Sequence, residues 1–128
     1  MSRKSKGINA ERELIHLFWG NGWASCRIAG SGSMRYPSAD VLATNKLRRL
    51  AIECKTSKDD SKYFTKEEIE QLKTFSNLFG SEPWIGVRFD RTDWFFINLE
   101  DLEEKQNSFF ISKELAKNKG LSFEELIK

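Results

Sequence analysis

Cysteine and histidine are scarce in this chain, whose 128 residues include two cysteines and one histidine. Cys26 and Cys54 form neither a C-x-x-C pair nor a disulfide framework, which fits a protein of a reducing compartment. His16 has no partner histidine, so we assign it no role and interpret both cysteines as small apolar packing residues. Chemistry based on a thiol or an imidazole is therefore not expected.

Long apolar runs are also lacking. No stretch approaches the roughly 18 consecutive apolar residues that a membrane span needs. The basic N-terminus MSRKSKG leads into a mixed segment and not into the apolar core of a signal peptide. We find no internal repeat, no linker and no GxxxxGK[ST] phosphate-binding pattern. We expect a soluble cytoplasmic protein of a host cell or a virus-infected cell. Its single domain would span 1–128, with a basic, mobile arm at 1–7 and a helical tail at 100–128.

Acidic residues are sparse in the first half of the chain. Residues 1–64 hold 12 Lys and Arg against 6 Asp and Glu, whereas residues 65–128 hold 9 against 13. A basic half is typical of proteins that bind a polyanion such as nucleic acid. An unevenly charged, merely solvated surface would give the same totals, and charge alone does not separate the two interpretations.

Hydrophobic periodicity and turn residues predict an α/β protein. A first helix is expected from about Ile8, with Asn9 as its N-cap and Asn21-Gly22 at its end. The segments predicted to be strands are 23–29, 39–45, 47–56, 83–89 and 93–99. This order predicts a central mixed five-stranded sheet flanked by helices. The segment 56–64 is predicted to be a polar loop.

A second helix is predicted after this loop. Thr65 and Glu68 have the spacing of a capping box, and Gly80 has the position of a helix stop. The residues that the periodicity predicts to be buried by this helix are Ile69, Leu72, Phe75, Ser76 and Phe79.

The segment AIECKTSK, residues 51–58, combines an apolar strand pattern with two charges. Residues two apart in a strand share a face, so Glu53 and Lys55 point to one side while Ile52 and Cys54 point to the other. Burying a carboxylate and an ammonium group is costly unless they are paired or bind a metal. The sequence therefore predicts either a functional site or a salt-bridged pair at this strand.

Other oxygen ligands could join this pair. Asp40 lies on the preceding predicted strand, and hairpin pairing would bring it beside Glu53. Glu11 could add a third carboxylate, and the backbone carbonyl of Cys54 a further oxygen. Such hard ligands suit Mg²⁺, which can activate water and stabilise charge on a reacting phosphate. Lys55 could position or deprotonate that water, or neutralise the developing charge. A salt bridge that binds nothing remains the alternative.

Arg12 and Arg27 are candidate phosphate ligands, because a guanidinium can bind phosphate through two parallel hydrogen bonds. Arg12 lies near a predicted helix N-terminus, where anions are favoured. Arg27 lies in an otherwise apolar strand, and it could equally be an edge residue facing water. The loop Gly30-Ser31-Gly32-Ser33 would let backbone N–H groups approach phosphates, although many such loops are only flexible.

Taken in order, several segments resemble the archaeal-type Holliday junction resolvases, a branch of the PD-(D/E)xK nuclease superfamily. These segments are AERELI, CRIAGSGS, YPSADVLA, AIECKTSKDD, KYFTKEEIEQLKTFSNLFG, PWIGVRF and WFFINLEDL. The resemblance covers about residues 7–102, and GLSFEELIK resembles the family's ending. It implies a restriction-endonuclease-like fold and a homodimer that nicks four-way DNA junctions at two symmetric positions. It also implies Mg²⁺ as the cofactor, with Mn²⁺ able to substitute.

The resemblance also implies roles for individual residues. Glu11, Asp40 and Glu53 match the family's acidic residues, Lys55 matches the lysine of the E-x-K motif, and Ser33, in preference to Ser31, matches a loop serine. We accordingly expect these five to be catalytic, with the three acids and the Cys54 carbonyl as metal ligands. The expected DNA contacts are Arg3, Lys4, Lys6, Arg12, Arg27, Ser31, Arg35, Lys46, Arg48, Arg49, Lys58 and Lys62.

Two features depart from the family's pattern. Ser38-Ala39-Asp40 stands where the superfamily name expects Pro-Asp, so the proline is displaced to Pro37, which affects the loop more than the ligand. Glu68 stands near a position at which some relatives carry glutamine, which puts a role for that position in doubt.

Two other functions remain open. A restriction-like or repair nuclease acting on linear or nicked duplex would use the same catalytic residues, and only a comparison of substrates separates it from a resolvase. An architectural module that binds junctions without cutting them is the non-enzymatic alternative. If the chain dimerises, we expect apolar residues of the second helix and the following strand at the interface, namely Phe75, Phe79 and Trp84.

Overall fold

A five-stranded sheet forms the centre of the computed structural model, which describes residues 3–30 and 35–128. Its strands, in sheet order, are β1 (Ala24–Arg27), β2 (Val41–Thr44), β3 (Arg49–Ser57), β5 (Glu82–Phe89) and β6 (Phe95–Ile97). β3 and β5 run parallel, and the other neighbouring pairs are antiparallel. The predicted mixed five-stranded sheet is confirmed.

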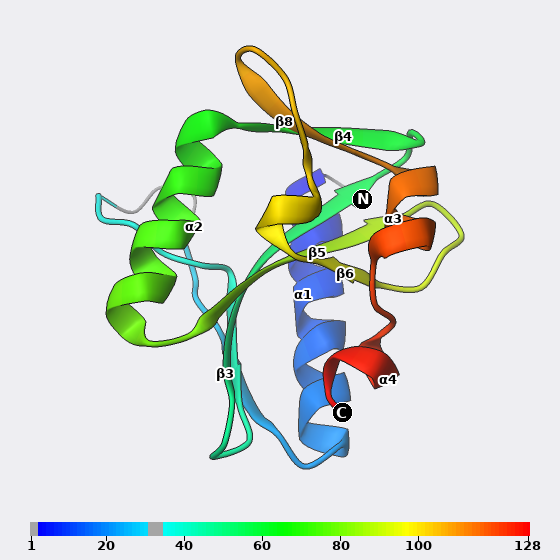
Figure 1. Ribbon diagram of the computed structural model, residues 1–128. Helices are drawn as coiled ribbons and strands as arrows, with labels where there is room; N and C mark the ends of the chain where they lie inside the picture. Colours follow the sequence, from blue (N-terminus) through cyan, green and yellow to red (C-terminus); the bar gives the residue numbers. More distant parts are fainter. Residues whose placement is uncertain (1–2, 31–34) are drawn as a thin grey trace.

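A second, three-stranded sheet was not predicted. Its antiparallel strands, in sheet order, are β4 (Ser61–Thr65), β8 (Ser108–Ser112) and β7 (Glu103–Glu104). The prediction of a polar loop at 56–64 and of a helical tail from 100 is therefore wrong over these residues. Phe64 is only 1% exposed, and its cross-strand neighbour Phe109 lies more than 40 residues away in the sequence. Cross-strand contacts of this kind stabilise the pairing of the strands. The β7–β8 hairpin projects at the top of Figure 1.

The helices are α1 (Arg3–Gly20), α2 (Lys66–Phe79), α3 (Lys113–Lys119) and α4 (Phe123–Leu126), with a 3₁₀ turn η2 (Leu99–Asp101). α1 begins at Arg3, so the predicted basic arm and the Asn9 N-cap are wrong. Lysine, arginine and alanine favour helix, and the single Gly7 costs only about 1 kcal/mol, so the helix extends through it. Within the described residues no helix is long and apolar enough to cross a membrane.

The two faces of the central sheet are covered by different helices (Figure 1). Ile52 and Cys54 on β3 pack with Leu14 and Phe18 of α1. Ala51, the residue before Ile52, faces the other way and packs with the α2 side chains. The α2 layer therefore lies on the same side as Glu53 and Lys55, which places the two charges between β3 and the start of α2.

The two ends of α2 agree with the sequence prediction. Thr65 is its N-cap and forms the full capping box with Glu68, and Gly80 ends it with a φ of 77°, a conformation that favours glycine. The buried stripe is shorter than predicted. Phe79 is 49% exposed, and its ring stacks on Phe75.

Candidate functional site

Asp40 is fixed against β3 by two hydrogen bonds. Its backbone N–H donates to the carbonyl of Ile52 at 3.0 Å, which continues the β2–β3 pairing by one residue. Its Oδ2 accepts the backbone N–H of Cys54 at 2.8 Å. The carboxylate therefore lies over the strand residue between these two, which is Glu53. The predicted approach of Asp40 to Glu53 through the hairpin is confirmed.

Glu53 is the strongly perturbed carboxyl of this group. Burial raises its pKa to about 8, and the adjacent Asp40, through its charge and a hydrogen bond, acts in the same direction. Lys55 lowers the pKa but does not offset the other effects. Two carboxyl groups thus share a half-buried space, an arrangement in which a bound cation would relieve the repulsion.

Lys55 lies between two carboxylates. Its Nζ is 3.1 Å from Oε2 of Glu68 on α2 and 3.9 Å from Oε2 of Glu53 on its own strand. Burial by itself would lower the pKa of Lys55, but the charges of Glu68 and Glu53 outweigh it, and the pKa is raised. Lys55 therefore carries its positive charge at neutral pH.

Glu11 approaches the pair from α1. Its Oε1 is 3.6 Å from Nη1 of Arg27 on β1, so the strand arginine pairs with it instead of facing water alone. Burial and the charge of Asp40 raise the pKa of Glu11, against the opposing effect of Arg27. Glu11 therefore interacts with the charge of Asp40, while its ion pair is with Arg27.

The donors fit a hard cation in part. In the part of the chain that the structure describes, no group of three or more His, Cys, Asp or Glu side chains is arranged to hold a metal. Asp40 and Glu53 supply two adjacent carboxylates, and the carbonyl of Cys54 lies on the same strand. Two carboxylates with several waters are a usual Mg²⁺ environment, so these residues fit the ion, and Glu11 as a further ligand stays a prediction.

Four lysines gather beside this group. A pocket of about 370 Å³ opens between the N-terminal part of α1, the end of β3 and β4. Its basic lining residues are Lys6, Lys55, Lys58 and Lys62. Three of these were predicted as DNA contacts, and the structure brings them to one pocket with the E-x-K lysine.

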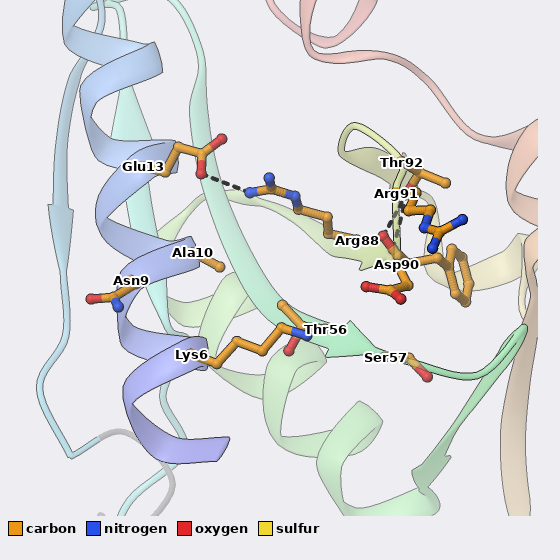
Figure 2. A pocket seen from close by; sticks show the side chains of 11 residues that line it. Lys6, Asn9, Ala10, Glu13, Thr56, Ser57, Arg88, Asp90, Arg91 and Thr92 are labelled. Carbon is orange, nitrogen blue, oxygen red and sulfur yellow. Dashed lines mark hydrogen bonds and ion pairs between the residues drawn. The ribbon is translucent and has the colours of Figure 1, made fainter. Parts of the chain in front are cut away.

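A second pocket, of about 300 Å³, adjoins the first and shares Lys6, Thr56 and Ser57 with it. Figure 2 shows Lys6 reaching across it from α1 toward Thr56. On its other side Arg88 of β5 donates to Glu13 of α1 at 2.7 Å. We call these two adjoining pockets at the end of β3, taken together, the lysine groove.

Three predicted DNA contacts lie away from the groove. Lys46, Arg48 and Arg49 sit at the β2–β3 turn and the first residue of β3, whereas Lys55, which lines the groove, lies toward the strand's other end. Arg48 has structural partners: it donates to both carboxylate oxygens of Glu82 and to the carbonyl of Leu126. The prediction that Arg48 binds phosphate therefore conflicts with its contacts in the fold.

The remaining predicted contacts are placed as follows. Arg12 is exposed on α1, and Arg35 is exposed with its guanidinium 5.8 Å from the ring centre of Tyr36. Ser31 and Ser33 lie outside the described residues, as do the side chains of Arg3 and Lys4, so their assigned roles stay predictions.

Sequence reasoning missed Arg88 and Arg91, which line the lysine groove from the β5–β6 side. Arg91 lies in the turn after β5 with a φ of 63°, and Thr92 fixes that turn by bonding to the backbone of Phe89. No local signal marks these arginines, because α1 and β5 meet only in the folded sheet. The contact of Glu68 with Lys55 was also missed, although the capping box placed Glu68 one turn into α2.

The expected interface residues divide into two groups. Trp84 is 6% exposed and belongs to the core under α1, so its prediction as a surface residue is wrong. Phe75 and Phe79 stack with ring centres 5.1 Å apart at the end of α2. Phe79 also closes an apolar groove of about 310 Å³ over the edge strand β1, with Cys26 and Leu42 among its other lining residues.

Comparison with known proteins identifies the family to which the chain is similar. The family model described as archaeal Holliday junction resolvase (Hjc) matches residues 2–128. The crossover junction endodeoxyribonuclease Hjc of Archaeoglobus fulgidus is 36% identical, with 95% of each chain aligned. The enzyme of the same name from Methanocaldococcus jannaschii is 35% identical, with 95% of this chain and 86% of the relative aligned.

A solved structure extends the likeness to three dimensions. The structure of Archaeoglobus fulgidus Hjc, a Holliday junction resolvase from an archaeal hyperthermophile, matches with a TM-score of 0.86 at 34% identity and covers 94% of both chains. Sequence and fold therefore lead to one conclusion: this chain belongs to the archaeal Holliday junction resolvase family.

Proposed function

We propose that this protein is a Mg²⁺-dependent endonuclease that resolves four-way DNA junctions by two symmetric nicks. The observation that carries the proposal is the placement of Asp40, Glu53 and Lys55 beside the lysine groove. Carboxylate ligands and a fixed cation suit phosphodiester hydrolysis, and a basic groove suits a DNA backbone. The names of the similar archaeal enzymes contain the crossover junction, or Holliday junction, which we propose as the substrate.

Each residue would have a separate task. Asp40 and Glu53, with the Cys54 carbonyl and with Glu11 as a further ligand, would hold Mg²⁺. The bound ion would lower the pKa of a water and offset charge on the phosphate; Mn²⁺ would do the same. Lys55 enters as an ammonium ion, since its pKa is raised. We therefore propose that Lys55 donates hydrogen bonds to the phosphate or to the water and that it does not remove a proton.

The lysine groove would hold the DNA backbone next to the scissile phosphate. Lys6, Lys58 and Lys62 come from three different elements or loops but line one pocket. Contacts from lysine to phosphate supply affinity and salt dependence without reading the base sequence. Selection of the junction would then depend on the shape of the DNA and on the spacing between two such grooves.

Two nicks require two sites, so we propose a homodimer. The apolar groove beside Phe79 lies over the edge strand β1, and Leu78 next to it is 85% exposed. A second copy of the chain covering this face would bury both side chains. The two free cysteines fit a reducing compartment, so we also propose a cytoplasmic location, in a host cell or a virus-infected cell.

Cleavage of a labelled synthetic junction tests the proposal. The matched substrate is a linear duplex of the same sequence, and each is incubated in Mg²⁺ and in EDTA. Paired nicks in the junction alone, absent in EDTA, are expected. Asp40→Asn should abolish cleavage while junction binding persists, because an amide oxygen can still accept the Cys54 N–H.

Other results would point to other functions. Equal cutting of the linear duplex would identify a general nuclease built on the same residues. Tight junction binding without cleavage in any divalent metal would identify an architectural module. Cleavage by Asp40→Asn at the wild-type rate would show that the metal site is assigned to the wrong residues.

A further inference from the structure

The carboxylate of Glu68 makes two contacts at once. Its Oε1 accepts the backbone N–H of Thr65 at 3.2 Å, which is half of the capping box of α2. Its Oε2 lies 3.1 Å from Nζ of Lys55 on β3. One side chain therefore connects the first turn of the helix to the lysine of the candidate site.

Lys55 depends on this contact for its position. Lysine carries its charge on a flexible four-carbon stem, which samples many rotamers unless the ammonium group is fixed. The nearest other carboxylate is Glu53, whose Oε2 is 3.9 Å away, beyond good hydrogen-bond distance. Lys55 and Glu68 are 29% and 33% exposed, so the closer pair is partly withdrawn from water and is screened less than a surface pair.

The orientation of Glu68 is itself fixed. The hydroxyl of Thr65 accepts the backbone N–H of Glu68 at 3.0 Å, so the side chain of each residue accepts the backbone N–H of the other. The adjacent turn of α2 is anchored by the buried Ile69, which is 1% exposed. The capping box therefore orients the Glu68 carboxylate independently of Lys55, so that Glu68 can hold the lysine in place.

We propose that Glu68 is a positioning residue of the nuclease. It holds the Lys55 ammonium group over the site, so that Glu53 is not needed as the partner of Lys55 and can serve the metal. The proposal rests on the function proposed above and adds to it a residue outside the E-x-K motif. Glu68 would not touch the reacting phosphate; it would act through Lys55.

The capping box allows the two roles of Glu68 to be separated. Glutamine serves at this position of a capping box as glutamate does, so Glu68→Gln keeps an acceptor for Thr65 but removes the negative charge that faces Lys55. Thr65→Ala is the matched control, because it removes the cap hydroxyl and leaves the Glu68 carboxylate in place. Neither variant alters a proposed metal ligand or a lysine of the groove.

Three measurements are made on wild type and both variants: kcat for junction cleavage, junction Kd in EDTA, and Tm. For Glu68→Gln we expect kcat to fall by roughly tenfold or more, since an electrostatically held catalytic group is misplaced. Its Kd should stay within about twofold and its Tm close to wild type. For Thr65→Ala we expect a lower Tm with most of kcat retained.

A metal-free measurement makes the test independent of cleavage. The side-chain ammonium of Lys55 can be followed by NMR in ¹⁵N-lysine-labelled protein in EDTA, with Lys55→Arg identifying its signal. Glu68→Gln should increase the mobility of this group, and Thr65→Ala should change it much less.

Two results would overturn the proposal: unchanged kcat and unchanged Lys55 mobility in Glu68→Gln, or a loss of kcat in both variants that simply follows their Tm. Failure of the wild type to cut junctions would refute the proposed function, while the NMR comparison would still decide whether Glu68 positions Lys55.

Discussion

Replacing Glu53 by glutamine should change how the stability of the metal-free protein depends on pH. Folding raises the pKa of this carboxyl from 4.5 to about 8, first through burial and then through Asp40. The folded protein therefore binds a proton at Glu53 more tightly than the unfolded chain does. For such a group the unfolding free energy is highest below pH 4.5 and falls as the pH rises toward 8.

The size of the effect follows from the two pKa values. The separation between 4.5 and about 8 sets an upper limit of about 5 kcal/mol on the stability lost across this window. The Glu53 side chain keeps 19% of its exposure, so screening by solvent reduces the penalty. We expect a loss of about 3 kcal/mol between pH 5 and pH 8. Glu53→Gln has no such proton to lose and should be the more stable protein at pH 8.

Urea denaturation in EDTA, at intervals from pH 5 to pH 9, measures this difference. The wild type and Glu53→Gln should have similar unfolding free energies near pH 5 and should diverge above it. The variant also serves as the control for every other titrating group, since those groups remain. Parallel pH profiles of the two proteins would refute the reasoning, because they would mean that Glu53 ionises alike in the folded and unfolded chain.

Mg²⁺ should reverse the divergence. At pH 8 a bound divalent cation stabilises the folded state by an amount set by its concentration relative to Kd. The wild type should gain stability on addition of Mg²⁺, and Glu53→Gln should gain little. Equal gains in both proteins would place the ion elsewhere.

Three further predictions concern other parts of the molecule. Arg48→Ala should lower the unfolding free energy by about 1 kcal/mol, because it leaves the partly exposed Glu82 without the guanidinium that it binds through both oxygens; denaturation measures this loss, and junction affinity should not change. Phe79→Asp should convert the proposed dimer to folded monomers in analytical ultracentrifugation, since the side chain is half exposed; a dimer that persists would exclude this face. Lys58→Gln combined with Lys62→Gln should weaken junction binding and reduce the slope of log Kd against log salt by about 2; an unchanged slope would remove these lysines from the DNA path.

The part of the site that could be predicted is local in the chain. Asp40 and Glu53 are brought together by a hairpin between neighbouring strands, and the two-residue alternation in β3 separates Glu53 from Ile52. The capping box of α2 is equally local, since Thr65 and Glu68 lie within one turn. Such features follow from spacing alone, and the structure agrees with them.

The rest depends on contacts between distant segments. Arg88 joins the lysine groove because β5 pairs with β3 and approaches α1. Arg48 resembles its basic neighbours in the sequence, and only the folded chain shows that its hydrogen bonds go to Glu82 and to the carbonyl of Leu126 in the last helix. The β4 strand likewise needs β8 as its partner. No pattern within one segment carries this information.

The parallel pairing of β3 with β5 has a consequence for the emerging chain. The candidate catalytic side chains and Glu68 all precede Gly80, whereas β5 begins at Glu82 and pairs with eight residues of β3. A nascent chain that has just completed α2 would contain all of these groups. It would still lack β5, which pairs with one edge of β3, the strand that aligns them. The cutting activity should thus appear only after the second half has been synthesised. A gene divided between α2 and β5 should yield two inert fragments that regain activity when they associate.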